Sequence, residues 1–175
     1  LDTPVPVIFV GSQRSADRPS SDNVMNALCS AAAASADLGE VAICMHGTVN
    51  DDYCAVHRAT RVRKMHTSRR DAFRSIGAEP IATVTYPELE VSLQADAIGR
   101  EGRKLILRDT MEERCALISY YPGMDPAVLD AYTSYRGLVI AGTGLGHVGT
   151  ALMERIRELV CNGTTIVMTT QCLHG

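Results

Sequence analysis

The most conspicuous motif with chemical potential is GLGHVG (residues 144–149), between the apolar run GLVIAG and the helix-forming segment TALMERIREL. A G-x-G-x-x-G pattern between a strand and a helix is typical of a dinucleotide-binding turn. Such a site also needs an acidic residue about 20 positions further on, to bind the ribose hydroxyls. Here the next strand ends in TTQC (169–172), without Asp or Glu. We therefore favour a tight turn, in which Gly142, Gly144 and Gly146 adopt backbone angles that other residues disfavour, over an NAD site. Such a turn could also contact a small ligand or a neighbouring subunit.

A second candidate is the basic segment that contains Lys64. Between residues 58 and 74 Asp71 is the only acid among many cations. Clustered cations can bind phosphate, but Phe73 is the only aromatic side chain available for stacking, and a solvated face with salt bridges explains the charge equally well. A lysine beside cationic neighbours such as Arg63 can also act as a base. Judged from the residue types alone, Lys64 is an ordinary surface lysine.

The cysteine and histidine residues do not indicate a metal site. The six cysteines have no short paired spacing and lie mostly in apolar stretches, as expected of reduced thiols that fill a core. Cys54-x-x-His57 and Cys172-x-His174 lack a fourth ligand, so we expect no metal. Walker, G-x-S-x-G and H-E-x-x-H motifs are also missing from the sequence.

The composition is that of a soluble globular protein. Apolar residues make up 46% of the 175 residues, and the net charge of −3 gives no general attraction to nucleic acid or membrane. No apolar run reaches the roughly 18 to 20 residues that cross a bilayer. With reduced cysteines, this predicts a cytoplasmic protein without membrane contact.

Alternating strands and helices would position the candidate residues. The pattern predicts a strand at 6–11, a helix with Asp22 as its N-cap and a strand at 41–47, joined by a parallel, right-handed crossover. The inward stripe of the helix would be Val24 or Met25, Leu28, Cys29 and Ala32.

A second alternating series begins at CALISYYPG (115–123) and continues through DPAVLDAYTS, GLVIAG, TALMERIRELV and TTIVMTT. Between the two series, residues 79–114 contain short β-type segments around the charged turn GREGRK, which predicts a hairpin-bearing linker. The alternation favours an α/β fold with parallel sheets, in two domains.

Three segments together resemble the type I L-asparaginase family. They are IFVGSQRSADRPSSDN (8–23), HGTVNDDYCAVHRATRVRKMHTSRRDAFRS (46–75), and GLVIAGTGLGHV followed by a helix and TIVMTTQC. The resemblance covers nearly the whole chain. It implies two α/β domains of the asparaginase type with parallel sheets, the first only partly present. Residues 1–78 would be the C-terminal half of the larger domain, and residues 115–175 the smaller C-terminal domain, truncated at its end.

The resemblance also implies a chemistry and roles for individual residues. Members of the family hydrolyse the side-chain amide of Asn or Gln with a threonine nucleophile, assisted by a lysine and an aspartate. Lys64 falls on the catalytic lysine. Ser12 falls where a backbone carbonyl helps to hold the substrate amide. His147 falls where a polar side chain reaches the neighbouring subunit's site, so the glycine loop would belong to the active site of a homodimer.

Two motifs of the family are not in this chain. These are the T-G-G-T-I-type nucleophile motif and the H-G-T-D-T segment with the second threonine and the triad aspartate. His46-Gly47-Thr48 continues with Val-Asn-Asp and follows the GSQR motif, so it is not the second of them. Both would lie upstream of Leu1. We therefore expect the 175 residues to belong to a longer protein and to be inactive alone.

Within the family, SQRSADRPSSDN and RVRKMHTSRRDAFRS most resemble the amidohydrolase components of archaeal tRNA-dependent amidotransferases. This implies a hydrolase-type component of a ligase complex in protein biosynthesis. It would release ammonia from Gln or Asn for a partner, the E subunit of the amidotransferase, which converts Glu-tRNA(Gln) to Gln-tRNA(Gln). ATP and Mg would bind only at that partner, and no cofactor in this chain. The basic stretch 58–74 could face tRNA or only the active site. A stand-alone type I L-asparaginase and a non-catalytic nucleotide-binding module are the alternatives.

Overall fold

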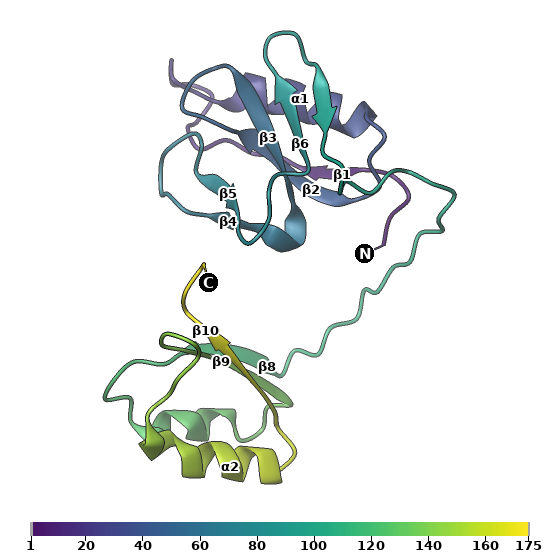
Figure 1. Ribbon diagram of the computed structural model, residues 1–175. Coiled ribbons are helices and arrows are strands. Elements are labelled where there is room, and N and C mark those ends of the chain that lie inside the picture. The colour runs from purple at the N-terminus through teal and green to yellow at the C-terminus, as the bar shows by residue number, and fades with distance from the viewer. Residues whose placement is uncertain (1, 175) are drawn as a thin grey trace. The chain divides into compact units, whose positions relative to one another are not determined.

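The computed structural model describes residues 2–174, and the chain divides into two compact units, 1–108 and 109–175 (Figure 1). The expected α/β class is observed in both units. The first unit extends beyond residue 78, where we expected the larger domain to end, and includes most of the segment expected as a linker. Within residues 2–174, no helix has the length and apolar character needed to span a membrane.

A five-stranded sheet forms the first unit, in the order β1-β2-β3-β6-β7. Its strands are β1 (Val7–Phe9), β2 (Val41–His46), β3 (Tyr53–Arg58), β6 (Ala82–Thr85) and β7 (Val91–Leu93). The parallel crossover from β1 to β2 is confirmed, but the other pairs are antiparallel, so the expectation of a parallel sheet was wrong for this unit. The physical reason is the connection 47–52, which is too short for a crossover and long enough for a hairpin.

Helix α1 (Asn23–Ser35) packs on one face of this sheet (Figure 1). Met25, Cys29 and Ala33, spaced four residues apart, face the buried side chains of β2, β3 and β6. Val24 and Leu28 instead point outward, with 64% and 43% of their surface exposed. The helix is apolar on most of its circumference, so periodicity could not select the face, and the small Cys and Ala side chains allow closer packing on the sheet.

The hairpin expected in residues 79–114 is formed by β6 and β7, which complete the edge of the sheet. Its turn lies at residues 86–90 and not at GREGRK. Arg100 and Arg103, in GREGRK, instead donate hydrogen bonds to backbone carbonyls of Ala34, Ala36 and Gly39, at the end of α1 and just after it. These bonds tie the segment to the first unit.

A separate two-stranded hairpin carries the basic segment. A 3₁₀ turn, η1 (Ala59–Arg61), leads from β3 into β4 (Val62–Lys64), which pairs antiparallel with β5 (Phe73–Ser75). Lys64 lies opposite Phe73 in this ladder, and the bond from the Met65 N–H to the Ala72 carbonyl (2.7 Å) extends the pairing by one residue.

The second unit has an all-parallel sheet, as expected, in the order β10-β9-β8. Its strands are β8 (Cys115–Ser119), β9 (Gly137–Gly142) and β10 (Thr165–Thr170). The 3₁₀ helices η2 (Pro126–Tyr132) and η3 (Thr150–Leu152) and helix α2 (Met153–Cys161) connect them. The core consists of residues such as Leu129, Leu138, Ile140, Leu152 and Leu159, which come from the strands and from all three helices.

Candidate active site

The loop after β1 contains Ser12, whose exposed hydroxyl donates to Asn23 Oδ1 at 3.1 Å. Asp22, which is buried, holds this loop in place. The Asp22 carboxylate accepts hydrogen bonds from the Gln13 and Arg14 N–H groups, each at 3.0 Å. Asp22 occupies the N-cap position of α1, as expected, but its side chain makes no capping bond because it is used by this loop.

Ser12 borders a cavity of about 240 Å³. The walls come from the end of β1 and the loop after it, from β2, and from the first residue of β5, Phe73. Side chains directly opposite each other in an antiparallel ladder project from the same face. Lys64, the partner of Phe73, therefore lies on the face of the hairpin that borders the Ser12 cavity.

The hairpin loop beyond Lys64 is held by an ion-paired carboxylate. Asp71 is only 4% exposed and accepts from Arg69 Nε at 2.9 Å and Nη2 at 2.8 Å, and from Arg74 Nη2. Burial alone would raise the pKa of Asp71, but the two guanidinium groups outweigh it and hold that pKa below its ordinary value. This cluster positions the loop that follows Lys64.

Much of the positive charge of the basic segment is neutralised by ion pairs. Arg58 pairs with Glu40, whose Oε1 accepts from Arg58 Nη2 at 3.0 Å, and Arg70 pairs with Asp51. Burial would raise the pKa of Glu40, but hydrogen bonds from Arg58 and from the Ile98 N–H lower it. Across residues 2–174, Lys64 has no ion-pair partner within 4 Å and its side chain is exposed.

His147 lies in the second unit, in the glycine loop between β9 and η3. The N–H groups of Gly146 and His147 donate to the Thr143 carbonyl at 2.9 and 2.8 Å, and the His147 carbonyl accepts from the Thr143 N–H. Two of the backbone donors of this loop are therefore used within it, and α2 begins only at Met153. The geometry is a closed turn and differs from a phosphate-binding loop at a helix N-terminus.

The glycines of this turn are needed for two different reasons. Gly144 and Gly146 have φ angles of 53° and 100°, in the left-handed region that we expected. Gly142 has an ordinary φ, in contrast to our expectation. A Cβ at position 142 would lie 2.5 Å from the backbone of Gly146 and of His147. Glycine is therefore needed there because these backbone segments approach each other closely.

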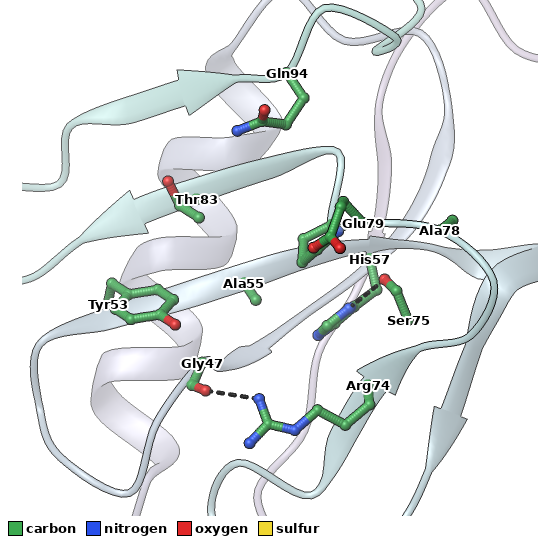
Figure 2. A pocket seen from close by; sticks show the side chains of 11 residues that line it. Gly47, Tyr53, Ala55, His57, Arg74, Ser75, Ala78, Glu79, Thr83 and Gln94 are labelled. Carbon is green, nitrogen blue, oxygen red and sulfur yellow. Dashed lines mark hydrogen bonds between the residues drawn. The ribbon is translucent and has the colours of Figure 1, made fainter. Parts of the chain in front are cut away.

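A larger cavity of about 420 Å³ lies beside the hairpin and includes His57 (Figure 2). His57 is 2% exposed, and its Nδ1 lies 2.9 Å from the Ser75 hydroxyl, while Nε2 is buried without a partner. Burial, and secondarily the charge of Arg74, lowers its pKa to about 4. Cys54 is buried in the core beneath α1, on the opposite face of β3, so Cys54 and His57 cannot bind one metal.

The structure thus brings the Ser12 loop and the Lys64 hairpin together in the first unit, whereas His147 lies in the second. Asn26 and His46, to which the sequence patterns gave no role, are both fully buried. A signal was present for Asn26, because it is a polar residue four positions after Asp22 on a mostly apolar helix. Across residues 2–174, no cluster of three His, Cys, Asp or Glu side chains could hold a metal ion.

Comparison with known proteins gives two matching family models and many relatives. The model described as "Asparaginase, N-terminal" matches residues 1–97, and that described as "Glutaminase/Asparaginase C-terminal domain" matches residues 114–175. The D subunit of the glutamyl-tRNA(Gln) amidotransferase of Methanosarcina mazei is 52% identical, and that of Archaeoglobus fulgidus 53% identical, over 100% of this chain and 42% of each relative. The chain therefore spans less than half the length of these curated relatives.

Solved structures agree with this result. The thermostable L-asparaginase from Thermococcus kodakarensis superposes with a TM-score of 0.76 at 26% identity, over 99% of this chain and 51% of that one. A probable cytoplasmic L-asparaginase from Campylobacter jejuni gives a TM-score of 0.78 at 19% identity, over 98% and 56% of the two chains. The second likeness is one of fold.

Proposed function

Because this chain belongs to the asparaginase family, we propose that it is part of a larger amidohydrolase that releases ammonia from the side-chain amide of Gln or Asn. The ammonia would serve a tRNA-dependent amidotransferase that converts Glu-tRNA(Gln) to Gln-tRNA(Gln). The observation that carries this proposal is the shared position of Ser12 and the Lys64 hairpin beside one cavity. About half of all positions are identical to relatives named as the D subunit of that amidotransferase, which favours this role.

In this proposal Lys64 is the base of the reaction. A threonine hydroxyl, supplied by a segment outside this chain, is a weak nucleophile until a base takes its proton. The Lys64 amine accepts that proton as the hydroxyl oxygen attacks the amide carbon, and the departing nitrogen takes a proton and leaves as ammonia. Water then hydrolyses the resulting ester. A backbone carbonyl in the Ser12 loop would accept a hydrogen bond from the substrate amide.

Further parts of the proposal concern the assembly. His147 would reach the site of a second copy in a homodimer. The E subunit of the amidotransferase would be the partner that receives the ammonia and binds ATP and Mg, in the cytoplasm. His147 is exposed on a turn fixed by its own backbone bonds, as expected of a residue that contacts a neighbouring chain.

A stand-alone L-asparaginase is the second candidate, favoured by the likeness to the Thermococcus kodakarensis enzyme. Both functions are tested by measuring ammonia release from Gln and from Asn by the full-length protein. The measurement is made alone, with Glu-tRNA(Gln), and with Glu-tRNA(Gln) plus the amidotransferase partner. Stimulation by the tRNA and partner is the expected result. Activity on Asn that is indifferent to both would contradict the amidotransferase role and favour the stand-alone enzyme.

A further inference from the structure

Two fully buried polar side chains meet between α1 and β2. Asn26 and His46 are each 0% exposed, and Nδ1 of His46 lies 2.6 Å from Oδ1 of Asn26. A buried polar group is costly unless its hydrogen bonds are satisfied, and apolar residues of the same size would fill a core without that cost. The pair therefore needs an explanation beyond filling the core.

On one side, Asn26 holds the loop of Ser12. Its Nδ2 donates to the Gly11 carbonyl at 2.9 Å and to Asp22 Oδ2 at 2.8 Å. Asp22 in turn accepts from the Gln13 N–H at 3.0 Å. The residues immediately before and after Ser12 are therefore both tied, directly or through one carboxylate, to the Asn26 amide. Because Nδ2 has these acceptors, Oδ1 is the atom that faces His46.

On the other side, His46 reaches the hairpin of Lys64. Its Nε2 lies 3.2 Å from Asp51 Oδ1, and the same oxygen accepts from Arg70 Nη1 at 2.6 Å. Arg70 belongs to the hairpin loop that follows Lys64, and it also donates to the Val49 carbonyl. Arg74, in β5, donates to the Gly47 carbonyl at 2.9 Å, which fastens the hairpin to the same 47–52 loop (Figure 2).

His46 is the centre of this chain of contacts because both of its ring nitrogens face oxygen atoms that accept hydrogen bonds. Asn26 Oδ1 is an amide oxygen and Asp51 Oδ1 a carboxylate oxygen. The ring therefore spans the space between α1 and the 47–52 loop, with one nitrogen at each side. Contacts on two sides fix the separation of these elements more tightly than a single contact would.

We propose that Asn26, His46 and Arg70 are positioning residues that hold the Ser12 loop and the Lys64 hairpin in register for amide hydrolysis. This inference rests on the proposed function. Asn26 and His46 are buried away from the cavity, so they act only through the segments that they connect. A displacement of about 1 Å between reacting groups can lower a rate about 100-fold. Loss of this chain of contacts therefore lowers kcat by more than the accompanying loss of stability explains.

The test compares full-length variants in steady-state ammonia release from Gln and Asn. Arg70→Ala breaks the link at the hairpin loop and lowers kcat about 10- to 100-fold with KM changed less than about threefold. Arg70→Lys keeps a cation beside Asp51 and restores most of kcat. His46→Asn retains a donor for Asn26 but loses Asp51. Because His46→Asn and Arg70→Ala interrupt the same chain, their combined loss is much smaller than the product of the single losses.

Arg100→Ala is the matched control. It removes an arginine of the same unit that donates to the Ala34 and Ala36 carbonyls, away from both segments, and leaves kcat unchanged. Thermal unfolding of every variant shows how much of any loss follows lower stability. A wild-type kcat in Arg70→Ala, or additive losses in the double variant, would overturn the inference while the proposed function stands. No ammonia release from the wild-type protein would overturn both.

Discussion

Lys64 lies directly opposite Phe73 in the β4–β5 ladder, and Phe73 forms part of the wall of the cavity beside Ser12. Two segments separated by about fifty residues of sequence are thus brought to one place by a hairpin of only three residue pairs. So short a hairpin has little stability of its own, and its position depends on the contacts of its loop.

Asp71 is the buried carboxylate of that loop and pairs with two arginines. Asp71→Asn removes the negative charge that pairs with Arg69 and Arg74, and should lower the free energy of unfolding at pH 7 by about 1 to 3 kcal/mol. The lowered pKa of Asp71 means that its contribution exists above its ordinary pKa of 3.8 and is lost as the pH falls through the lower, folded-state value. Urea denaturation at pH 7 and below pH 4 measures both effects.

The control for this prediction is Asp17→Asn, which changes an exposed aspartate in the loop after β1. It should leave the unfolding midpoint unchanged. Equal stability of Asp71→Asn and the wild type at pH 7 would show that the two arginine pairs contribute nothing to the hairpin.

His57 should make the stability of the first unit sensitive to mild acid. Its pKa is about 4 in the folded protein and 6.5 ordinarily, so between these values the unfolded chain binds more protons. The contribution of His57 to stability is therefore complete above pH 6.5, falls by up to about 3 kcal/mol as the pH drops to 4, and changes no further below that pH. His57→Asn should flatten this part of the profile, and His147→Asn, a change at an exposed position, should not.

The measurement is the urea midpoint of each variant at intervals between pH 4 and 7, together with an NMR titration of the His57 ring. A His57 ring that titrates near 6.5, or a His57→Asn variant with the wild-type pH dependence, would contradict the prediction.

Gly142 should tolerate no side chain. A Cβ at this position would lie 2.5 Å from the backbone of Gly146 and His147, and backbone atoms cannot move aside as a flexible side chain can. Gly142→Ala is expected to destabilise the second unit by about 1 to 3 kcal/mol and to increase amide hydrogen exchange at residues 143–147. Gly102→Ala, where a Cβ meets nothing within 4 Å, is the control. Unchanged exchange in Gly142→Ala would show that the turn has another conformation.

Local patterns predicted the elements with strong periodicity. The strands near residues 6–11, 41–47 and 137–142 and the helix from Asn23 were predicted because each is an apolar run bounded by turn residues. Strand β3 (Tyr53–Arg58) was missed, since YCAVHR ends in His57 and Arg58 and continues directly into the basic segment. With it, the antiparallel half of the sheet was missed too.

The buried polar contacts could not be predicted from local sequence. His46 ends an apolar strand and Asn26 lies in an apolar helix, and nothing in either segment shows that the two side chains meet. The contact depends on how α1 crosses the sheet, which is a property of the tertiary structure. The roles of Lys64 and Ser12 were expected only from the resemblance to a family, and the cavity that is lined by Ser12 and by Phe73, the ladder partner of Lys64, emerged from the structure.

The proposed role of Lys64 as the base of amide hydrolysis can be tested by removing its amine. The measurement is the kcat of ammonia release from Gln and Asn by the full-length protein, its Lys64→Ala variant, and Lys104→Ala as the control at the other lysine of this chain. Lys64 is exposed, so its removal leaves the fold intact, and loss of a general base lowers kcat about 100-fold or more. We expect that loss in Lys64→Ala and wild-type activity in Lys104→Ala. A folded Lys64→Ala protein with a kcat within a few-fold of the wild type would contradict it.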